Sequence, residues 1–369
     1  MSVPVTHIPG ANQGQGRDAA RAAAKLHGMA EALGVLRHRG PAERERAAEY
    51  AAEVLAHEVK PADWRRAGLP APAGRADGVP VSHQAVLHLA STALSLRCSG
   101  LPAVQRADLW ARLAALFGPV VTPGDPWLSR LRERILNARV DAEDTSPEVV
   151  DKLLGVYQRH ARTEGRDAYL TSLARVNLAI AYCQRGTGTD LAEAVRLGRQ
   201  EIQARADRYG PTHPVTLMAR SLLVRCLIAQ AEAADDQDER LRLAREAFDD
   251  ADRVRAARDR LFGVISVNAT LMRRYQGHAL LLLGDMERAR ACLRHALAFD
   301  TARNGNQEWR GSGPTHLLLA RVHRALGDRP SALVHARNAA RLLATDAPGG
   351  PSHRAAEALL REVERRPGS

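Results

Sequence analysis

The sequence predicts an all-α solenoid built from stacked antiparallel helix pairs. Apolar runs with helical spacing recur between about residues 169 and 343, and three of them stop at Gly186, Gly284 and Gly327. Glycine accepts the left-handed backbone conformation that ends a helix. A second helix is expected after each stop, and in three of four copies it carries two alanines seven residues apart, namely Ala244 and Ala251, Ala289 and Ala296, and Ala332 and Ala339. Only 4% of the residues are aromatic, which favours close-packed helices over a β-sandwich.

The alanine pairs indicate how the helices pack. Seven residues make two helical turns, so both alanines of a pair lie on one face. Small side chains on that face let a neighbouring helix approach closely, as the stacking of helix pairs into a solenoid requires. The first copy departs from the pattern, because Ala194 is followed by Glu201 at the position of the second alanine. Its register is therefore the least regular of the four.

This pattern resembles the tetratricopeptide repeat (TPR). The anchor alanines Ala194, Ala244, Ala289 and Ala332 are 50, 45 and 43 residues apart, which is longer than the basic repeat of about 34 residues. The opening Gly210-Pro211-Thr212-His213 and its reuse at Gly313-Pro314-Thr315-His316 look like the longer repeats of kinesin light chains and many bacterial regulatory proteins. The resemblance implies a right-handed superhelical solenoid and names no reaction.

Taken in order, the chain divides where proline and glycine accumulate. Gly40-Pro41 separates two amphipathic runs, a Pro/Gly-rich passage precedes Pro80, and Pro348 to Pro351 precede a polar last helix that can close the end of a solenoid. The expected segments are a disordered arm over 1–16, a helical hairpin over 17–66, a linker over 67–80, degenerate repeats over 81–164, four TPR-like repeats over 165–346, and a capping helix within 347–369.

The chain is basic, with 53 Lys and Arg against 42 Asp and Glu and a formal charge of +11. The excess lies in residues 262–369, which hold 16 basic and 9 acidic side chains. A basic region raises nucleic acid or an acidic partner as a ligand. Because almost all of the cations are arginines in an alanine-rich chain, the charge also fits a general compositional bias. A regulator that contacts nucleic acid through this region stays open as an alternative.

No catalytic or cofactor motif is present. The chain lacks a G-x-S-x-G elbow, a phosphate-binding loop, a dinucleotide fingerprint and an H-E-x-x-H helix. His316 and His323 lie on one helical face, but no carboxylate accompanies them at ligand spacing. We therefore expect no enzyme activity, no cofactor and no metal, with a motif-poor helical enzyme as the alternative.

Cysteine usage and the absence of targeting signals indicate a location. Cys98, Cys183, Cys226 and Cys292 show no C-x-x-C spacing, so free thiols in a reducing compartment are expected. The first residues lack the pattern of a signal peptide, and no apolar stretch reaches the length of a membrane helix. We expect a soluble cytoplasmic protein.

The register of the first helices predicts a binding groove. If the TPR pattern applies, its concave face carries Asn177, Arg225, Arg274, His278, Arg321 and Arg324. The groove would become more basic toward the C-terminus, and arginine binds carboxylates with two parallel hydrogen bonds. The expected partner is a protein or peptide with an acidic or carboxylate-bearing segment, held by a non-catalytic scaffold. Trp309, between polar neighbours, is a further candidate for packing or for contact with a partner.

Overall fold

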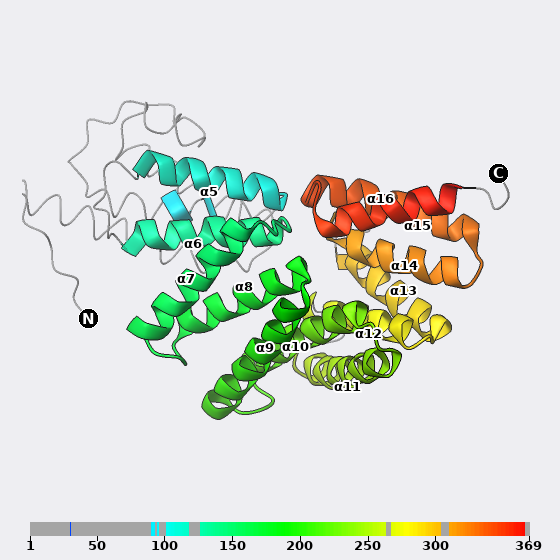
Figure 1. The fold of residues 1–369 in the computed structure, drawn as a ribbon, viewed down its shortest axis with the longest axis horizontal. Coiled ribbons are helices and arrows are strands. Elements are labelled where there is room, and N and C mark those ends of the chain that lie inside the picture. Colours follow the sequence, from blue (N-terminus) through cyan, green and yellow to red (C-terminus); the bar gives the residue numbers. More distant parts are fainter. Residues whose placement is uncertain are drawn as a thin grey trace, which may run out of the picture. The chain divides into compact units, whose positions relative to one another are not determined.

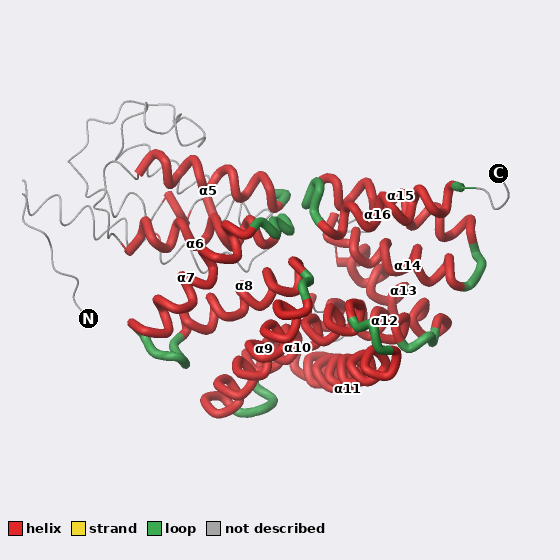
Figure 2. The backbone as a smooth tube through the Cα atoms, in the orientation of Figure 1, coloured by secondary structure: helices red, strands yellow, loops and turns green. Residues whose placement is uncertain are grey.

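The computed structural model describes residues 30, 90–92, 94–95, 101–117, 126–262, 267–303 and 310–365, and every regular element among them is a helix (Figure 1). Figure 2 shows short loops between those neighbouring helices whose connections are among the described residues. The helices are α5 (Ala103–Phe117), α6 (Pro126–Asp141), α7 (Pro147–Thr163), α8 (Tyr169–Arg185), α9 (Gly188–Tyr209), α10 (Pro214–Ala233), α11 (Gln237–Phe262), α12 (Val267–Leu282), α13 (Met286–Arg303), η2 (Arg310–Ser312), α14 (Gly313–Ala325), α15 (Arg329–Asp346) and α16 (Pro351–Glu364). The prediction of an all-α fold is confirmed for this part of the chain.

The chain forms two compact units, Met1–Ala138 and Arg139–Ser369, and the boundary falls in the last turn of α6. In the first unit, Trp110 and Leu113 of α5 are buried, and the guanidinium of Arg134 on α6 lies 4.9 Å from the centre of the Trp110 ring. The predicted arm, hairpin and linker over 1–80 lie outside the described residues except for Ala30, as do Cys98 and Trp309.

The second unit is a TPR-like solenoid of four helix pairs, α8–α9, α10–α11, α12–α13 and α14–α15, preceded by α7 and followed by α16. Each helix packs against the next along the chain. The first helices of the pairs also contact one another in succession, from α8 through α10, α12 and α14 to α16. These first helices therefore form a continuous inner layer, and α9, α11, α13 and α15 are the second helices of the pairs.

The ends of the helices follow the predicted signals. Gly186, Gly284 and Gly327 have φ angles of 73°, 82° and 75°, in the left-handed region that glycine adopts without strain. After Gly327, the side chain of Asp328 accepts a hydrogen bond from the backbone N–H of Ser331 and so caps α15. The glycine that ends α14 is therefore directly followed by the residue that caps α15.

The predicted alanines lie in the seams between helices. Ala194, Ala244, Ala251, Ala289, Ala296, Ala332 and Ala339 are all fully buried. In the last repeat, Ala332 and Ala339 pack with Leu317 of α14 and Leu359 of α16. The small side chains therefore stand where neighbouring helices approach most closely, as the solenoid requires.

The two Gly-Pro-Thr-His sequences do not form the same opening, contrary to the expectation. Gly210 follows α9 with a φ of 92°, and His213 caps α10, which begins at Pro214. Gly313, in contrast, is itself the first residue of α14. The second sequence has no proline corresponding to Pro214. Its helix therefore begins earlier, at Gly313 and Pro314.

Glu201, the residue that breaks the alanine pattern, lies in a buried polar network. Its carboxylate accepts hydrogen bonds from the Ser172 hydroxyl, from Arg175 Nη1 at 2.8 Å and from Arg205 Nε at 2.7 Å. The four residues are between 2% and 6% exposed. Two guanidiniums and a hydroxyl thus compensate the charge that replaces an alanine in this seam.

Among the described residues, α10 alone is long and apolar enough to cross a membrane by length and composition. In the window that qualifies, 61% is buried inside the structure. The expectation that no apolar stretch reaches this length is therefore wrong for α10, which is a core helix of the solenoid.

Candidate functional site

The predicted site residues all lie on the inner layer of helices. Asn177 is on α8, Arg225 is on α10, Arg274 and His278 are on α12, and Arg321 and Arg324 are on α14. His278 and Arg321 are 43 residues apart, the spacing that also separates Ala289 from Ala332. They therefore occupy equivalent positions in successive repeats, and stacking brings them side by side.

A carboxylate of the protein itself joins these two residues. Glu232, in the last turn of α10, places Oε1 3.0 Å from His278 Nε2 and 2.7 Å from Arg321 Nη1. Burial alone would raise the pKa of Glu232, but its bonds to His278 and Arg321 outweigh burial and lower that pKa to about 2. The carboxylate is therefore ionised at neutral pH, and three successive inner helices are linked through one oxygen atom.

Arg324 is also paired within the protein. Its Nη1 donates a hydrogen bond to Oε2 of Glu362 on α16. Both side chains are largely exposed, at 46% and 59%. An exposed pair of this kind contributes at most about 1 kcal/mol. Arg324 is consequently available to exchange partners at little cost.

Arg225 and Arg274 are the unpaired cations of the predicted set, because no carboxylate of the described residues forms an ion pair with either guanidinium. Arg225 is half-buried. Burial would lower the pKa of its guanidinium, but nearby ionisable groups, of which Tyr275 on α12 has the largest effect, outweigh burial and raise that pKa. Arg274 lies over the ring of Tyr275 at 5.7 Å. The inner helices therefore carry two guanidiniums that have no carboxylate partner among the described residues.

Asn177 was expected to hold a peptide backbone. It lies half-buried on α8 and already has an interaction within the protein. The Cys226 thiol on α10 lowers the pKa of Cys183, which lies further along α8. Cys183, Cys226 and Cys292 are free thiols, of which Cys226 is buried and the other two are half-buried.

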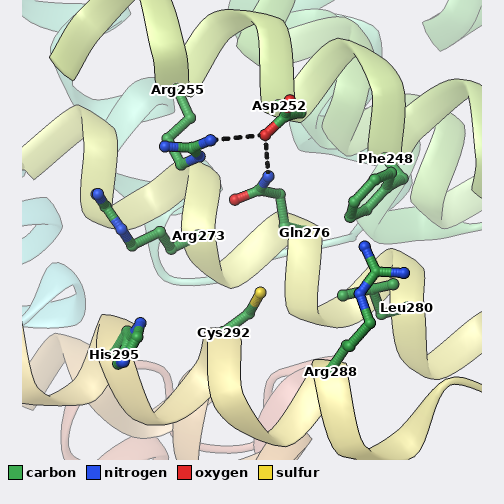
Figure 3. A pocket seen from close by; sticks show the side chains of 9 residues that line it. All are labelled: Phe248, Asp252, Arg255, Arg273, Gln276, Leu280, Arg288, Cys292 and His295. Carbon is green, nitrogen blue, oxygen red and sulfur yellow. Dashed lines mark hydrogen bonds and ion pairs between the residues drawn. The ribbon is translucent and has the colours of Figure 1, made fainter.

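A separate cavity of about 340 Å³ lies between α11, α12 and α13 (Figure 3). Asp252 Oδ1 accepts hydrogen bonds from Arg255 at 2.7 Å and from Gln276 at 2.9 Å. Figure 3 shows the Cys292 sulfur pointing into the cavity, and burial raises the pKa of that thiol. Arg273 pairs with Asp259 and Arg288 with Asp285. The arginines that line this cavity are thus matched by carboxylates, unlike Arg225 and Arg274 on the inner helices.

Three histidines stack in the last repeat. Nδ1 of His316 lies 2.9 Å from Nδ1 of His335, and the His335 ring stacks on His323 at 5.4 Å. His323 in turn bonds Asp328 at 2.9 Å. Within the described residues, no group of three or more His, Cys, Asp or Glu side chains is arranged to hold a metal ion.

Sequence reasoning singled out cations of the inner helices but missed the carboxylates that pair with three of them. Glu232 and Glu362 lie on inner helices, yet neither belongs to a motif. Glu232 precedes His278 by 46 residues and Arg321 by 89, so the separations are close to one and two repeat lengths. That spacing is the signal that could have identified it.

Comparisons with known proteins agree with this architecture. No family model matches the chain, and no curated protein matches it. Among solved structures, a Rap protein complexed with competence and sporulation factor has a TM-score of 0.50 at 10% identity, over 94% of this chain and 88% of that one. TPR-like repeats of a putative kinesin light chain from Podosopora anserina reach a TM-score of 0.40 at 20% identity, over 58% of this chain and 96% of that one. The likeness to the Rap protein shows the TPR-like fold.

Proposed function

We propose that this protein is a non-catalytic interaction scaffold whose inner groove binds a protein or peptide segment bearing acidic side chains or a terminal carboxylate. The observation that carries the proposal is the convergence of His278 and Arg321, from successive repeats, on one carboxylate oxygen. Donors from two helices that meet at one oxygen form a site matched to a carboxylate. Arg225 and Arg274 add unpaired positive charge to the same inner layer.

The fold supports a binding role. The Rap protein that shares this fold was solved in complex with competence and sporulation factor. The stacked helices of a solenoid present an extended concave surface that suits a protein or peptide partner. We place this activity in the cytoplasm, where the free thiols would remain reduced.

The nucleic-acid alternative has less support. Several arginines of the basic C-terminal region are paired with carboxylates of the protein, including Arg288 with Asp285, Arg290 with Glu287 and Arg337 with Glu364. Paired guanidiniums contribute little net charge toward a phosphate backbone. Arg225 and Arg274, on the inner helices, have no such carboxylate partner among the described residues.

Binding of a fluorescein-labelled hexaglutamate peptide, followed by fluorescence anisotropy, tests the proposal. Replacing Arg274 and Arg321 by alanine removes two charge-assisted contacts, and we expect affinity to fall at least about tenfold. Arg242→Ala with Arg253→Ala is the matched control, because both arginines are exposed on the second helix α11. The control lowers the net charge equally and should change affinity by less than about twofold.

Duplex DNA provides the comparison ligand. Binding to DNA through several phosphates would weaken by orders of magnitude between low and moderate salt. If hexaglutamate binds equally well to the wild type and to the Arg274/Arg321 double variant, the groove is not the binding surface. If DNA binds more tightly than hexaglutamate at moderate salt, the nucleic-acid function replaces the one proposed.

A further inference from the structure

Glu232 occupies the position in which a ligand carboxylate would bind. It reaches from the end of α10 across α12 to α14, and its Oε1 receives the donors of both His278 and Arg321. No other carboxylate among the described residues pairs with either side chain. The donor pair of the groove is therefore filled by a group of the protein itself.

The filled site is accessible to solvent. The side chains of Glu232 and Arg321 are 38% and 32% exposed, whereas His278 is 15% exposed. A partly exposed ion pair is weakened by solvent and exchanges readily. A second carboxylate can therefore reach Arg321 without unfolding any helix.

The free cations lie close by in the fold. Arg274 is one helical turn before His278 on α12, and Arg225 lies two turns before Glu232 on α10. Neither has a carboxylate partner within the described part of the chain. An acidic segment can be held first by these guanidiniums, which raises the local concentration of its other carboxylates beside the Glu232 site.

From this arrangement we infer that Glu232 is an internal competitor in the groove, displaced when a carboxylate of the bound segment takes over its contacts with His278 and Arg321. The inference rests on the proposed function. It implies that a ligand with at least two carboxylates binds best, since one is held by Arg225 or Arg274 and another replaces Glu232. Displacement also breaks the link from α10 to α14, so binding is coupled to the packing of successive repeats.

Three substitutions test this in the full chain with the hexaglutamate probe. Glu232→Gln keeps the shape and removes the charge, and Glu232→Asp keeps the charge but is one methylene shorter. Glu239→Gln is the matched control, because Glu239 lies on α11 and pairs there with Arg242. Circular dichroism of each variant establishes that it is folded.

Glu232→Gln should bind hexaglutamate about three- to tenfold more tightly than the wild type, and Glu239→Gln within about twofold of it. Glu232→Asp should also bind more tightly, because the shortened side chain cannot hold both donors. Because Glu232→Asp leaves the net charge unchanged, a gain in its affinity for hexaglutamate would show that the Glu232 side chain occupies the site in the wild type. If hexaglutamate binds only after Glu232 is replaced, the competitor role is supported as well.

Two results overturn the inference. If the wild type binds and depends on Arg274 and Arg321, but both Glu232 variants bind no more tightly than Glu239→Gln, Glu232 is a structural link and the proposed function stands alone. If neither the wild type nor any Glu232 variant binds the probe, the proposed function and the inference fail together.

Discussion

The first and last repeats of the solenoid have the same helix-pair architecture with opposite chemistry in the seam. In the last repeat, Ala332 and Ala339 are fully buried among apolar side chains of α14, α15 and α16. In the first repeat, Ala194 is followed by Glu201, whose carboxylate is 2% exposed. The seam therefore tolerates either a methyl group or a charged network at the same position.

The difference teaches that a buried carboxylate can replace an alanine in this seam when donors from both helices of the pair bind it. Ser172, Arg175 and Arg205 all donate to Glu201, so its carboxylate has a donor on each oxygen. Breaking a buried ion pair on one side costs far more than replacing the whole group by apolar residues. The first repeat is thus predicted to be sensitive to single substitutions in a way that the last repeat is not.

The largest expected effect comes from Glu201→Ala. This substitution restores the alanine pattern of the other repeats, yet it leaves two guanidiniums buried without a counterion. We expect a loss of about 3–5 kcal/mol in the free energy of unfolding. Urea denaturation followed by circular dichroism measures it.

A compensated variant distinguishes this cause from simple cavity formation. Replacing Arg175 by Met, Glu201 by Ala and Arg205 by Leu removes all three charges together and should recover most of the lost stability. If the triple variant is less stable than Glu201→Ala, the network is not what limits this seam. The two repeats would then differ in packing and not in charge.

The sequence predicted one side of this comparison well. Helical periodicity, stop glycines and alanine pairs are local signals, so α12 to α15 and their seams could be anticipated. Glu201 was recognised as a departure, but two of its three donors lie 26 and 29 residues away on α8 and follow no repeat spacing. The same limit applies to the inner helices, where the arginines were read from register and Glu232 was missed.

A second prediction compares two glycines in the helix interfaces. A Cβ at Gly277 would lie 2.6 Å from Leu293 Cγ and 3.2 Å from the carbonyl oxygen of Ala289. At Gly198, in the first repeat, the nearest atom would be 3.4 Å away, in ordinary contact range. Gly277→Ala should cost about 1–3 kcal/mol through overpacking. Gly198→Ala should be neutral or stabilising by up to about 1 kcal/mol, because alanine is the better helix former.

Thermal denaturation of the two variants side by side provides the measurement. Both introduce the same methyl group into a helix, so Gly198→Ala serves as the control for helix propensity. Equal melting temperatures for the two variants would mean that the α12–α13 seam can open without cost, contrary to the close approach seen at Leu293.

A third prediction concerns the pH dependence of stability. The last repeat contains a cluster of histidines, whereas the buried polar network of the first repeat contains arginines. Burial, followed by the charges of His316, His323 and Arg294, lowers the pKa of His335 to about 4, and Asp328 opposes this. His335 is thus neutral in the folded state, whereas the unfolded chain binds a proton below about pH 6.5. Its contribution to stability is present above pH 6.5 and is lost as the pH falls toward 4.

Solvent screening limits the size of this effect to about 1 kcal/mol at pH 5. Urea midpoints of the wild type and of His335→Gln at pH 7 and pH 5 measure it. The glutamine variant should lose less stability between the two pH values than the wild type. An equal loss in both proteins would assign the pH dependence to groups outside the stack.

The most local effect is expected where the two ends of the second unit meet. Glu143, in the turn after α6, has a φ of 56° and accepts hydrogen bonds from the backbone N–H of Ser352 at 2.7 Å and from its hydroxyl at 2.5 Å. Gly350, which precedes α16, has no capping side chain, so Glu143 performs that function across 209 residues.

Glu143→Ala should therefore destabilise the second unit by about 0.5–1.5 kcal/mol, the usual net value of such hydrogen bonds. Glu143→Gln retains an oxygen acceptor without the charge and should lose less, so it serves as the conservative control. Hydrogen exchange locates the effect: the amides at the start of α16 should exchange faster in Glu143→Ala, while those of α8 keep their wild-type rates. Uniformly faster exchange throughout the solenoid would show that the contact supports the whole unit, whereas unchanged exchange at Ser352 would show that it does not cap α16. Uniformly faster exchange would mean that the two ends of the second unit unfold together. The first and last repeats would then not be independent regions.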